Sequence, residues 1–166
     1  ASRGASAART MRAAVLPRFG GPDVIEIRHV PIPRCTPDEV LVRMQAASIN
    51  PLDLRVREGY GRSIYEGMLP LVLGRDISGE VVDAGPGGGL GRGPFAPGAE
   101  VFGVIPPQRR WGTHAEFAAV PRKYLQPKPS GMRHEDAAAI PFAAMTAWRA
   151  LQNTGGLKPR QRVLLL

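Results

Sequence analysis

Glycine and proline divide this chain into short segments, and their spacing limits what the chain can fold into more than any other feature. The 166 residues include 20 glycines and 17 prolines. Both residue types interrupt helices and strands, because glycine adds backbone freedom and proline lacks an N–H group. Hydrophobic residues make up 43% and charged residues 22%, which is an ordinary balance for a folded chain with a core. We therefore expect one domain, mainly β with short helices, rather than a helix bundle.

Short runs in which apolar and polar residues alternate predict the strands. The first two runs flank a Gly-Gly-Pro turn, a pattern typical of a β-hairpin. The third run is the longest and predicts a half-buried strand. The predicted strands cover residues 11–19, 24–30, 39–49, 77–85, 100–105 and 113–120.

One short helix is predicted between these strands, at residues 51–59. Asn50 suits its cap and Gly59 suits its end. Residues 60–70 are expected to form a loop, and the glycine-rich stretch 85–98 is expected to form a flexible insert.

The hydrophobic pattern changes after residue 130. An alanine-rich helix is predicted at 141–151 and ends before a Gly-Gly pair. An apolar run at 161–166 follows, which is typical of a buried parallel strand. A dinucleotide-binding domain would place a glycine-rich turn after such a strand, and the sequence has none there. We therefore expect residues 131–166 to be a linker helix and the first strand of a truncated, otherwise missing Rossmann domain.

The net charge of +8 comes mostly from arginine. The arginines fall in different segments and aromatic residues make up only 6%, whereas nucleic-acid sites combine clustered basic residues with aromatic ones. We expect a basic surface and no nucleic-acid partner, although an acidic protein partner fits the charge equally well. No apolar run approaches the roughly 18 residues that a membrane span requires.

Residues 1–10 have the composition of an organellar address. They contain Arg3 and Arg9, several alanines and serines, and no acidic residue. We expect a transit-peptide remnant, with a short disordered tail as the alternative, and a mitochondrial location in preference to a chloroplast one. The single cysteine, Cys35, excludes an internal disulfide and a cysteine-rich zinc site.

Five motifs, in a fixed order along the chain, carry a resemblance to a known family. They are AASINPLD at 46–53, PLVLGRDISGEV at 70–81, PGAEV at 97–101, WGTHAEF at 111–117, and AAAIP with TAW within 137–148. Together they resemble the medium-chain dehydrogenase/reductase superfamily in its zinc-independent quinone oxidoreductase branch, and they are similar to mitochondrial reticulon-interacting oxidoreductases. The resemblance implies that residues 11–130 form a GroES-like barrel, the N-terminal domain of alcohol dehydrogenases.

The resemblance also implies roles for individual residues. Asn50 and Tyr60 are the candidate catalytic residues in a full-length form. Asn50, Asp53 and Thr146 would bind the cofactor, with Asn50 at its nicotinamide end. Each residue also has a structural interpretation: Asn50 as a helix cap, Asp53 as support for the first helical turn, and Tyr60 and Thr146 as packing residues.

No metal site is expected. Zinc-dependent relatives carry a cysteine and a histidine–glutamate pair where this chain has Ser48 or Asn50 and Arg75-Asp76. A catalytic zinc needs about three converging protein ligands, and the three histidines of this chain fall on different predicted elements. We expect Arg75 and Asp76 to form a local or partly buried ion pair.

Two functions from different classes remain open. In the first, the chain binds no cofactor and is a structural or accessory subunit of an organellar, mitochondrial complex. A protein partner would then cover its C-terminal strand, because an unpaired strand edge promotes aggregation. In the alternative, the chain is a fragment of an active NADPH-dependent quinone or enone reductase, and NADPH binds where the Rossmann domain is present. The end at an apolar run favours the first function.

Overall fold

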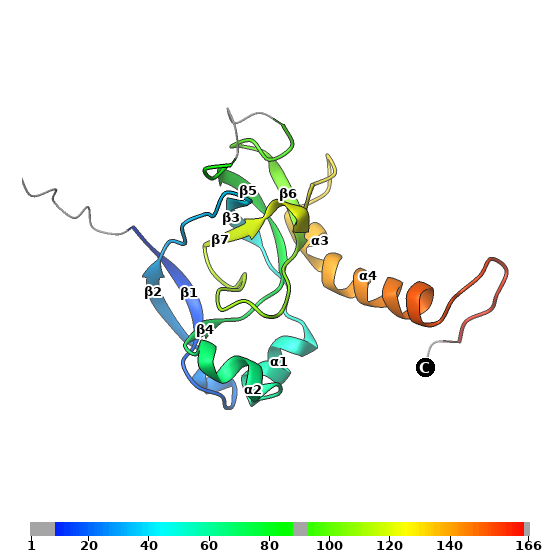
Figure 1. Ribbon diagram of the computed structural model, residues 1–166, viewed down its shortest axis with the longest axis horizontal. Coiled ribbons are helices and arrows are strands. Elements are labelled where there is room, and N and C mark those ends of the chain that lie inside the picture. The colour runs from blue at the N-terminus through cyan, green and yellow to red at the C-terminus, as the bar shows by residue number, and fades with distance from the viewer. Residues whose placement is uncertain (1–8, 88–92, 165–166) are drawn as a thin grey trace, which may run out of the picture.

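The computed structural model describes residues 9–87 and 93–164, and it places a helical arm on one side of a β-rich body (Figure 1). The strands are β1 (Thr10–Leu16), β2 (Glu26–Pro31), β3 (Glu39–Ala46), β4 (Leu71–Val72), β5 (Asp76–Asp83), β6 (Glu100–Val104), β7 (Phe117–Pro121) and β8 (Leu125–Pro127). The helices are α1 (Pro51–Glu58), α2 (Arg62–Tyr65), α3 (His134–Ala139) and α4 (Pro141–Trp148). A π-helical turn at Arg149–Thr154 continues α4.

Two antiparallel sheets hold the strands. The smaller sheet has the order β2-β1-β4, and the larger sheet has the order β7-β3-β5-β6-β8. In the larger sheet Leu41 pairs with Asp83 and Ala46 pairs with Ser78. The end of β3 therefore lies beside the start of β5, and the start of β3 lies beside the end of β5.

Alternation along β3 and β5 builds the main core. Val40, Val42, Ile77 and Val81 are fully buried on one face of the larger sheet. Arg43 is exposed because alternate side chains of a strand point to opposite faces. Burial of each of these aliphatic side chains stabilises the fold by about 1.5–3 kcal/mol.

α1 and α2 cover a second core cluster. Val56 of α1 and Tyr65 of α2 pack with Leu16 of β1 and Leu71 of β4. Gly59 ends α1 with a φ of 103°, a left-handed conformation that glycine adopts without strain. The chain can therefore turn directly into α2, although the sequence predicts a loop for residues 60–70.

The remaining predicted strands are found, with shifted ends. The strand predicted at 113–120 begins only at Phe117, and of the residues before it Ala115 forms an isolated bridge with Ala13. β4 and β8 are two and three residues long, which is too short for an alternating pattern to be recognised.

The arm contains α3, α4 and the π-helical turn; α3 packs on the larger sheet, and α4 with the turn projects away from it (Figure 1). The strand predicted at 161–166 is not formed over 161–164, which have no regular secondary structure. A strand needs a neighbour to pair with its backbone groups, and residues 161–164 have no such neighbour within the described part of the chain. Residues 165–166, like 1–8 of the predicted address and 88–92 of the predicted insert, lie outside the described residues.

Among the described residues, no helix is both long enough and apolar enough to cross a membrane. α4 nevertheless exposes large apolar side chains, including Met145 and Trp148. Neither of these side chains belongs to a core cluster.

Replacing Gly79 by alanine is expected to destabilise the barrel, because β3 and β5 approach closely there. An added Cβ would lie 2.2 Å from the backbone carbonyl oxygen of Arg43. Overpacking of this kind costs about 1–3 kcal/mol, so the melting temperature should fall by roughly 2–10 °C. Gly67→Ala is the control, since a Cβ there meets nothing within 4 Å. Equal melting temperatures for the two variants would contradict the close approach.

Candidate functional site

A buried polar network lies where the end of β3 meets the start of β5. Asp76 is only 1% exposed, and its Oδ2 accepts a hydrogen bond from the Asn50 side-chain amide at 2.8 Å and another from the Ser48 hydroxyl. Its Oδ1 accepts a hydrogen bond from the backbone N–H of Phe142 at 2.7 Å. These four residues are called the Asp76 network below. It joins the segment after β3, the start of β5 and the first turn of α4.

Asp53, in the first turn of α1, holds the backbone next to the Asp76 network in place. It is 2% exposed, and its Oδ2 accepts the backbone N–H of Asn50 at 2.8 Å, as in one half of a capping box. Its Oδ1 accepts the backbone N–H of Gly74 at 2.9 Å. Both carboxylate oxygens are thus engaged by backbone groups, and they fix Asn50 at the start of α1.

His114 contacts the backbone of Ser48. Its Nε2 lies 3.0 Å from the backbone carbonyl oxygen of Ser48. Because a carbonyl oxygen only accepts, this nitrogen carries the proton. His114 therefore donates to the loop that presents Ser48 and Asn50 and helps to fix its path.

The structure brings together some of the predicted site residues and separates others. Asn50 and Asp53 lie in one cluster, and Thr146 lies one turn beyond Phe142 on α4, where its hydroxyl donates to the Phe142 carbonyl oxygen at 2.7 Å. Tyr60 follows the far end of α1, about 15 Å from Asn50 at the rise of an α-helix. Its side chain is 68% exposed, so packing does not hold it in the loop.

The ion pair predicted between Arg75 and Asp76 is wrong. Adjacent residues in extended backbone point to opposite sides, so the two side chains diverge. Arg75 is fully buried, and its Nη1 donates to the Pro106 carbonyl oxygen at 3.4 Å. Burial lowers the pKa of Arg75, and the nearby Tyr65 and Asp53 partly offset this effect.

A second polar chain anchors α3 to the larger sheet. The Ser78 hydroxyl lies 2.7 Å from Nδ1 of His134, and Nε2 of His134 lies 3.0 Å from Glu100. The Lys128 ammonium lies 3.2 Å from the other oxygen of Glu100. Hydrogen bonds from Lys128 and His134 lower the pKa of Glu100. Asp76 and Ser78, both on β5, therefore fix the two helices of the arm.

Among the described residues, no group of three or more histidine, cysteine, aspartate and glutamate side chains is arranged to hold a metal ion. The residues near Asp76 offer a hydroxyl, an amide and one carboxylate. Zinc in proteins is bound mainly by thiolates and imidazoles, with carboxylates as additional ligands.

The family model for the alcohol dehydrogenase GroES-like domain matches residues 36–130. That span contains every strand of the larger sheet and the whole Asp76 network except its contact from α4. The chain therefore belongs to the alcohol dehydrogenase GroES-like domain family.

Similarity to individual known proteins indicates the type of oxidoreductase that the chain resembles. The chain is 39% identical to the NAD(P)H oxidoreductase RTN4IP1, mitochondrial, of Danio rerio, over 97% of the chain and 46% of that protein. It is 34% identical to the chloroplast envelope quinone oxidoreductase homolog of Arabidopsis thaliana, over 84% of the chain and 41% of that protein. The solved quinone oxidoreductase of Coxiella burnetii matches with a TM-score of 0.80 and 28% identity, over 89% of the chain and 46% of that structure.

The chain thus spans about half the length of the curated relatives it matches. The resemblance to the quinone oxidoreductases of the medium-chain dehydrogenase/reductase superfamily is confirmed, as is the mainly β, GroES-like fold. The expected mitochondrial location agrees with the names of the RTN4IP1 relatives, and the chloroplast alternative is represented by the Arabidopsis thaliana protein.

Sequence reasoning identified Asn50 and missed the residue that fixes its side chain. The available signal was the resemblance, which sets Ser48 or Asn50 and Arg75-Asp76 at the places where zinc-dependent relatives carry a cysteine and a histidine–glutamate pair. In this chain Ser48 and Asn50 are joined to Asp76 by hydrogen bonds.

Asp76→Asn is expected to lower the free energy of unfolding by about 2–4 kcal/mol. The asparagine would turn an amide N–H₂ group toward donors that need an acceptor, and a buried unpaired group costs that much. Urea denaturation measures the loss. Asp23→Asn, at an exposed position, is the control and should change stability by less than about 0.5 kcal/mol. An equally small change for Asp76→Asn would contradict the role of the network.

Proposed function

We propose that this domain forms the substrate side of an NADPH-dependent reductase of quinones or enones. The observation that carries the proposal is the Asp76 network, which fixes the Asn50 side chain beside the first turn of α4. The relatives named NAD(P)H oxidoreductase and quinone oxidoreductase homolog support the reaction class.

The described residues fit one end of a dinucleotide. Asn50 and Thr146 offer neutral hydrogen-bonding groups on either side of the Phe142 contact, which suits a carboxamide and a ribose. A pyrophosphate is usually held by a glycine-rich turn that opens a helix after a parallel strand, and the strand pairs of the described residues are antiparallel. NADPH, when bound, would supply a hydride, and the rest of its site would come from a Rossmann domain.

The residues of this chain would then position the nicotinamide end of the cofactor and polarise the oxygen being reduced. Asn50 would orient the nicotinamide end, because its amide is held by Asp76 and its backbone by Asp53. The exposed Tyr60 hydroxyl would donate a hydrogen bond to the oxygen being reduced. Asp53 and Asp76 act through Asn50 and are positioning residues rather than catalytic ones.

The proposal includes no metal. Hydride transfer to a conjugated carbonyl needs a hydrogen-bond donor near the oxygen, and a tyrosine hydroxyl can fill that role. The hydroxyl, amide and carboxylate around Asp76 are already engaged with one another and with Phe142.

The accessory function stays a prediction. Its sequence argument depends on an unpaired apolar strand at 161–166, and residues 161–164 form no strand. The proposed protein partner over that segment therefore has less support than the reductase. A mitochondrial location is compatible with either function.

The full-length protein should oxidise NADPH in the presence of a soluble quinone, and NADPH should raise its melting temperature. Tyr60→Phe should lower kcat about 10- to 100-fold, because a positioned hydrogen-bond donor is lost. Its melting temperature should not change, since the side chain is 68% exposed. Steady-state kinetics and thermal denaturation measure the two effects.

Thr10→Val is the control, because it also removes one hydroxyl from an exposed position and lies on β1, where it pairs with Pro31 and lines no part of the proposed site. Equal kcat values for the two variants would remove Tyr60 from the mechanism and leave the reductase function in place. If NADPH neither raises the melting temperature nor reduces any quinone or enone, the reductase function is wrong and the accessory function is favoured.

A further inference from the structure

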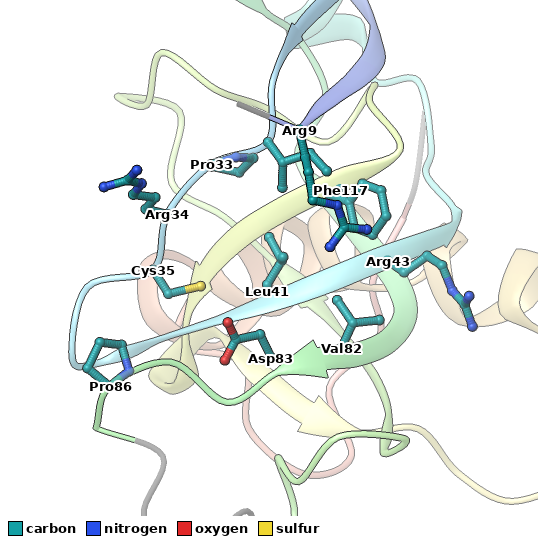
Figure 2. A pocket seen from close by; sticks show the side chains of 11 residues that line it. Arg9, Pro33, Arg34, Cys35, Leu41, Arg43, Val82, Asp83, Pro86 and Phe117 are labelled. Atoms are coloured by element: carbon teal, nitrogen blue, oxygen red, sulfur yellow. The ribbon is translucent and has the colours of Figure 1, made fainter. Parts of the chain in front are cut away.

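A cavity of about 760 Å³ lies over β3 and β5, near the end that is remote from the Asp76 network (Figure 2). Leu41 and Asp83, which pair with each other, both line it. Asp83 and Asp76 stand at opposite ends of β5, about 23 Å apart along an extended strand. The cavity is therefore separate from the site of the proposed reductase function.

The floor of this cavity is apolar. Leu41 of β3, Val82 of β5 and Phe117 of β7 are half-buried on the sheet face opposite to the main core. Ile32 and Pro33, between β2 and β3, form a wall. Apolar residues on the outer face of a sheet normally need a cover, and here the cover is incomplete.

The rim of the cavity is mostly basic. Arg9, Arg34 and Arg43 line it together with one carboxylate, Asp83. Arg43 is paired with Glu80 at 2.6 Å, whereas Arg9 and Arg34 form no ion pair with any other residue in the described ranges. Figure 2 shows Arg9 and Arg43 on one side of the floor, and Arg34 at the opposite rim with its guanidinium directed outward. Together with Glu80, the rim holds three guanidinium groups and two carboxylates, which leaves an excess of one positive charge, and Arg9 is the guanidinium beside the floor that has no ion pair among the described residues.

We propose that this cavity binds a small organic anion, a carboxylate or sulfonate that carries an aromatic or aliphatic body. The volume suits a ligand of roughly 20 non-hydrogen atoms. The body would pack on Leu41, Val82 and Phe117, and the anionic group would bind to Arg9 and Arg43. Guanidinium groups favour carboxylate and sulfonate oxygens because they donate paired hydrogen bonds.

Cys35 provides a local reporter of occupancy. It is the only cysteine of the chain and it lines the cavity. Burial, followed by the charges of Asp83 and Glu39, raises the pKa of its thiol to about 11. The thiol therefore reacts slowly near neutral pH and faster as the pH rises, and a bound ligand should shield it.

The test uses two fluorescent probes of similar shape, the anion 1-anilinonaphthalene-8-sulfonate and the neutral N-phenyl-1-naphthylamine. The anion should bind saturably and slow the alkylation of Cys35 by N-ethylmaleimide at pH 9. The double variant Arg9→Gln/Arg43→Gln should weaken anion binding at least about tenfold and change neutral-probe binding less than about twofold. Leu41→Trp, which fills the floor and keeps the arginines, should weaken both probes.

Arg149→Gln is the matched control, because this arginine lines a different cavity beside α4. The proposal is overturned if the anion binds the double variant as tightly as the original protein, if Arg149→Gln weakens it instead, or if Cys35 is not protected. It is also overturned if the protein sediments as a dimer in which Cys35 is protected without any probe, since a second copy would then fill the cavity. Thermal denaturation of each variant confirms that it is folded.

Discussion

The carboxylate of Asp76 sets the geometry of the functional end of this domain. Three donors from two other segments meet on its two oxygens: the Ser48 hydroxyl, the Asn50 amide and the Phe142 backbone N–H. A buried charge is costly unless such donors surround it, so the loop after β3 and the first turn of α4 must come to this point together. Asp53 is a second buried carboxylate whose oxygens are surrounded by donors, in this case two backbone N–H groups.

The same pair of strands supports two different surfaces. At the start of β5 the polar side chains of Asp76 and Ser78 fix the arm and Asn50. Toward the end of β5, Val82 and Asp83 form part of an open cavity with a basic rim. Because the register between β3 and β5 is fixed by hydrogen bonds along the ladder, each surface keeps its place relative to the other. The proposed reductase site and the proposed anion cavity therefore use different residues of the same two strands.

The sequence predicts the strands that alternate clearly and the helix that has clear end signals. β3, β5 and α1 follow from the apolar spacing and from Asn50 and Gly59. β4 and α2 do not. β4 depends on its pairing with β1, and α2 packs through Tyr65 against Leu16 of the same strand, which lies far away in sequence. Residues 161–164 show the opposite case, in which an apolar run has no strand to pair with among the described residues.

The candidate site is predictable only in part for a similar reason. Asn50 is marked by its motif, whereas its link to Asp76 spans 26 positions and requires the β3–β5 register. Adjacent opposite charges suggest that Arg75 pairs with Asp76, but extended backbone sends the two side chains to different sides. Pairing between neighbours in sequence is therefore a poor guide where the chain is extended.

The contact between Asp76 and the first turn of α4 fixes one end of that helix against the larger sheet. α4 and the π-helical turn that continues it span 14 residues, or about 21 Å at the rise of an α-helix. At this length, a tilt of α4 by roughly 10° about its first turn would move Thr154 by about 4 Å. The direction of the chain beyond Thr154 therefore depends on the few contacts that seat the start of the arm, namely the Phe142–Asp76 hydrogen bond and the Ser78–His134–Glu100 chain at α3.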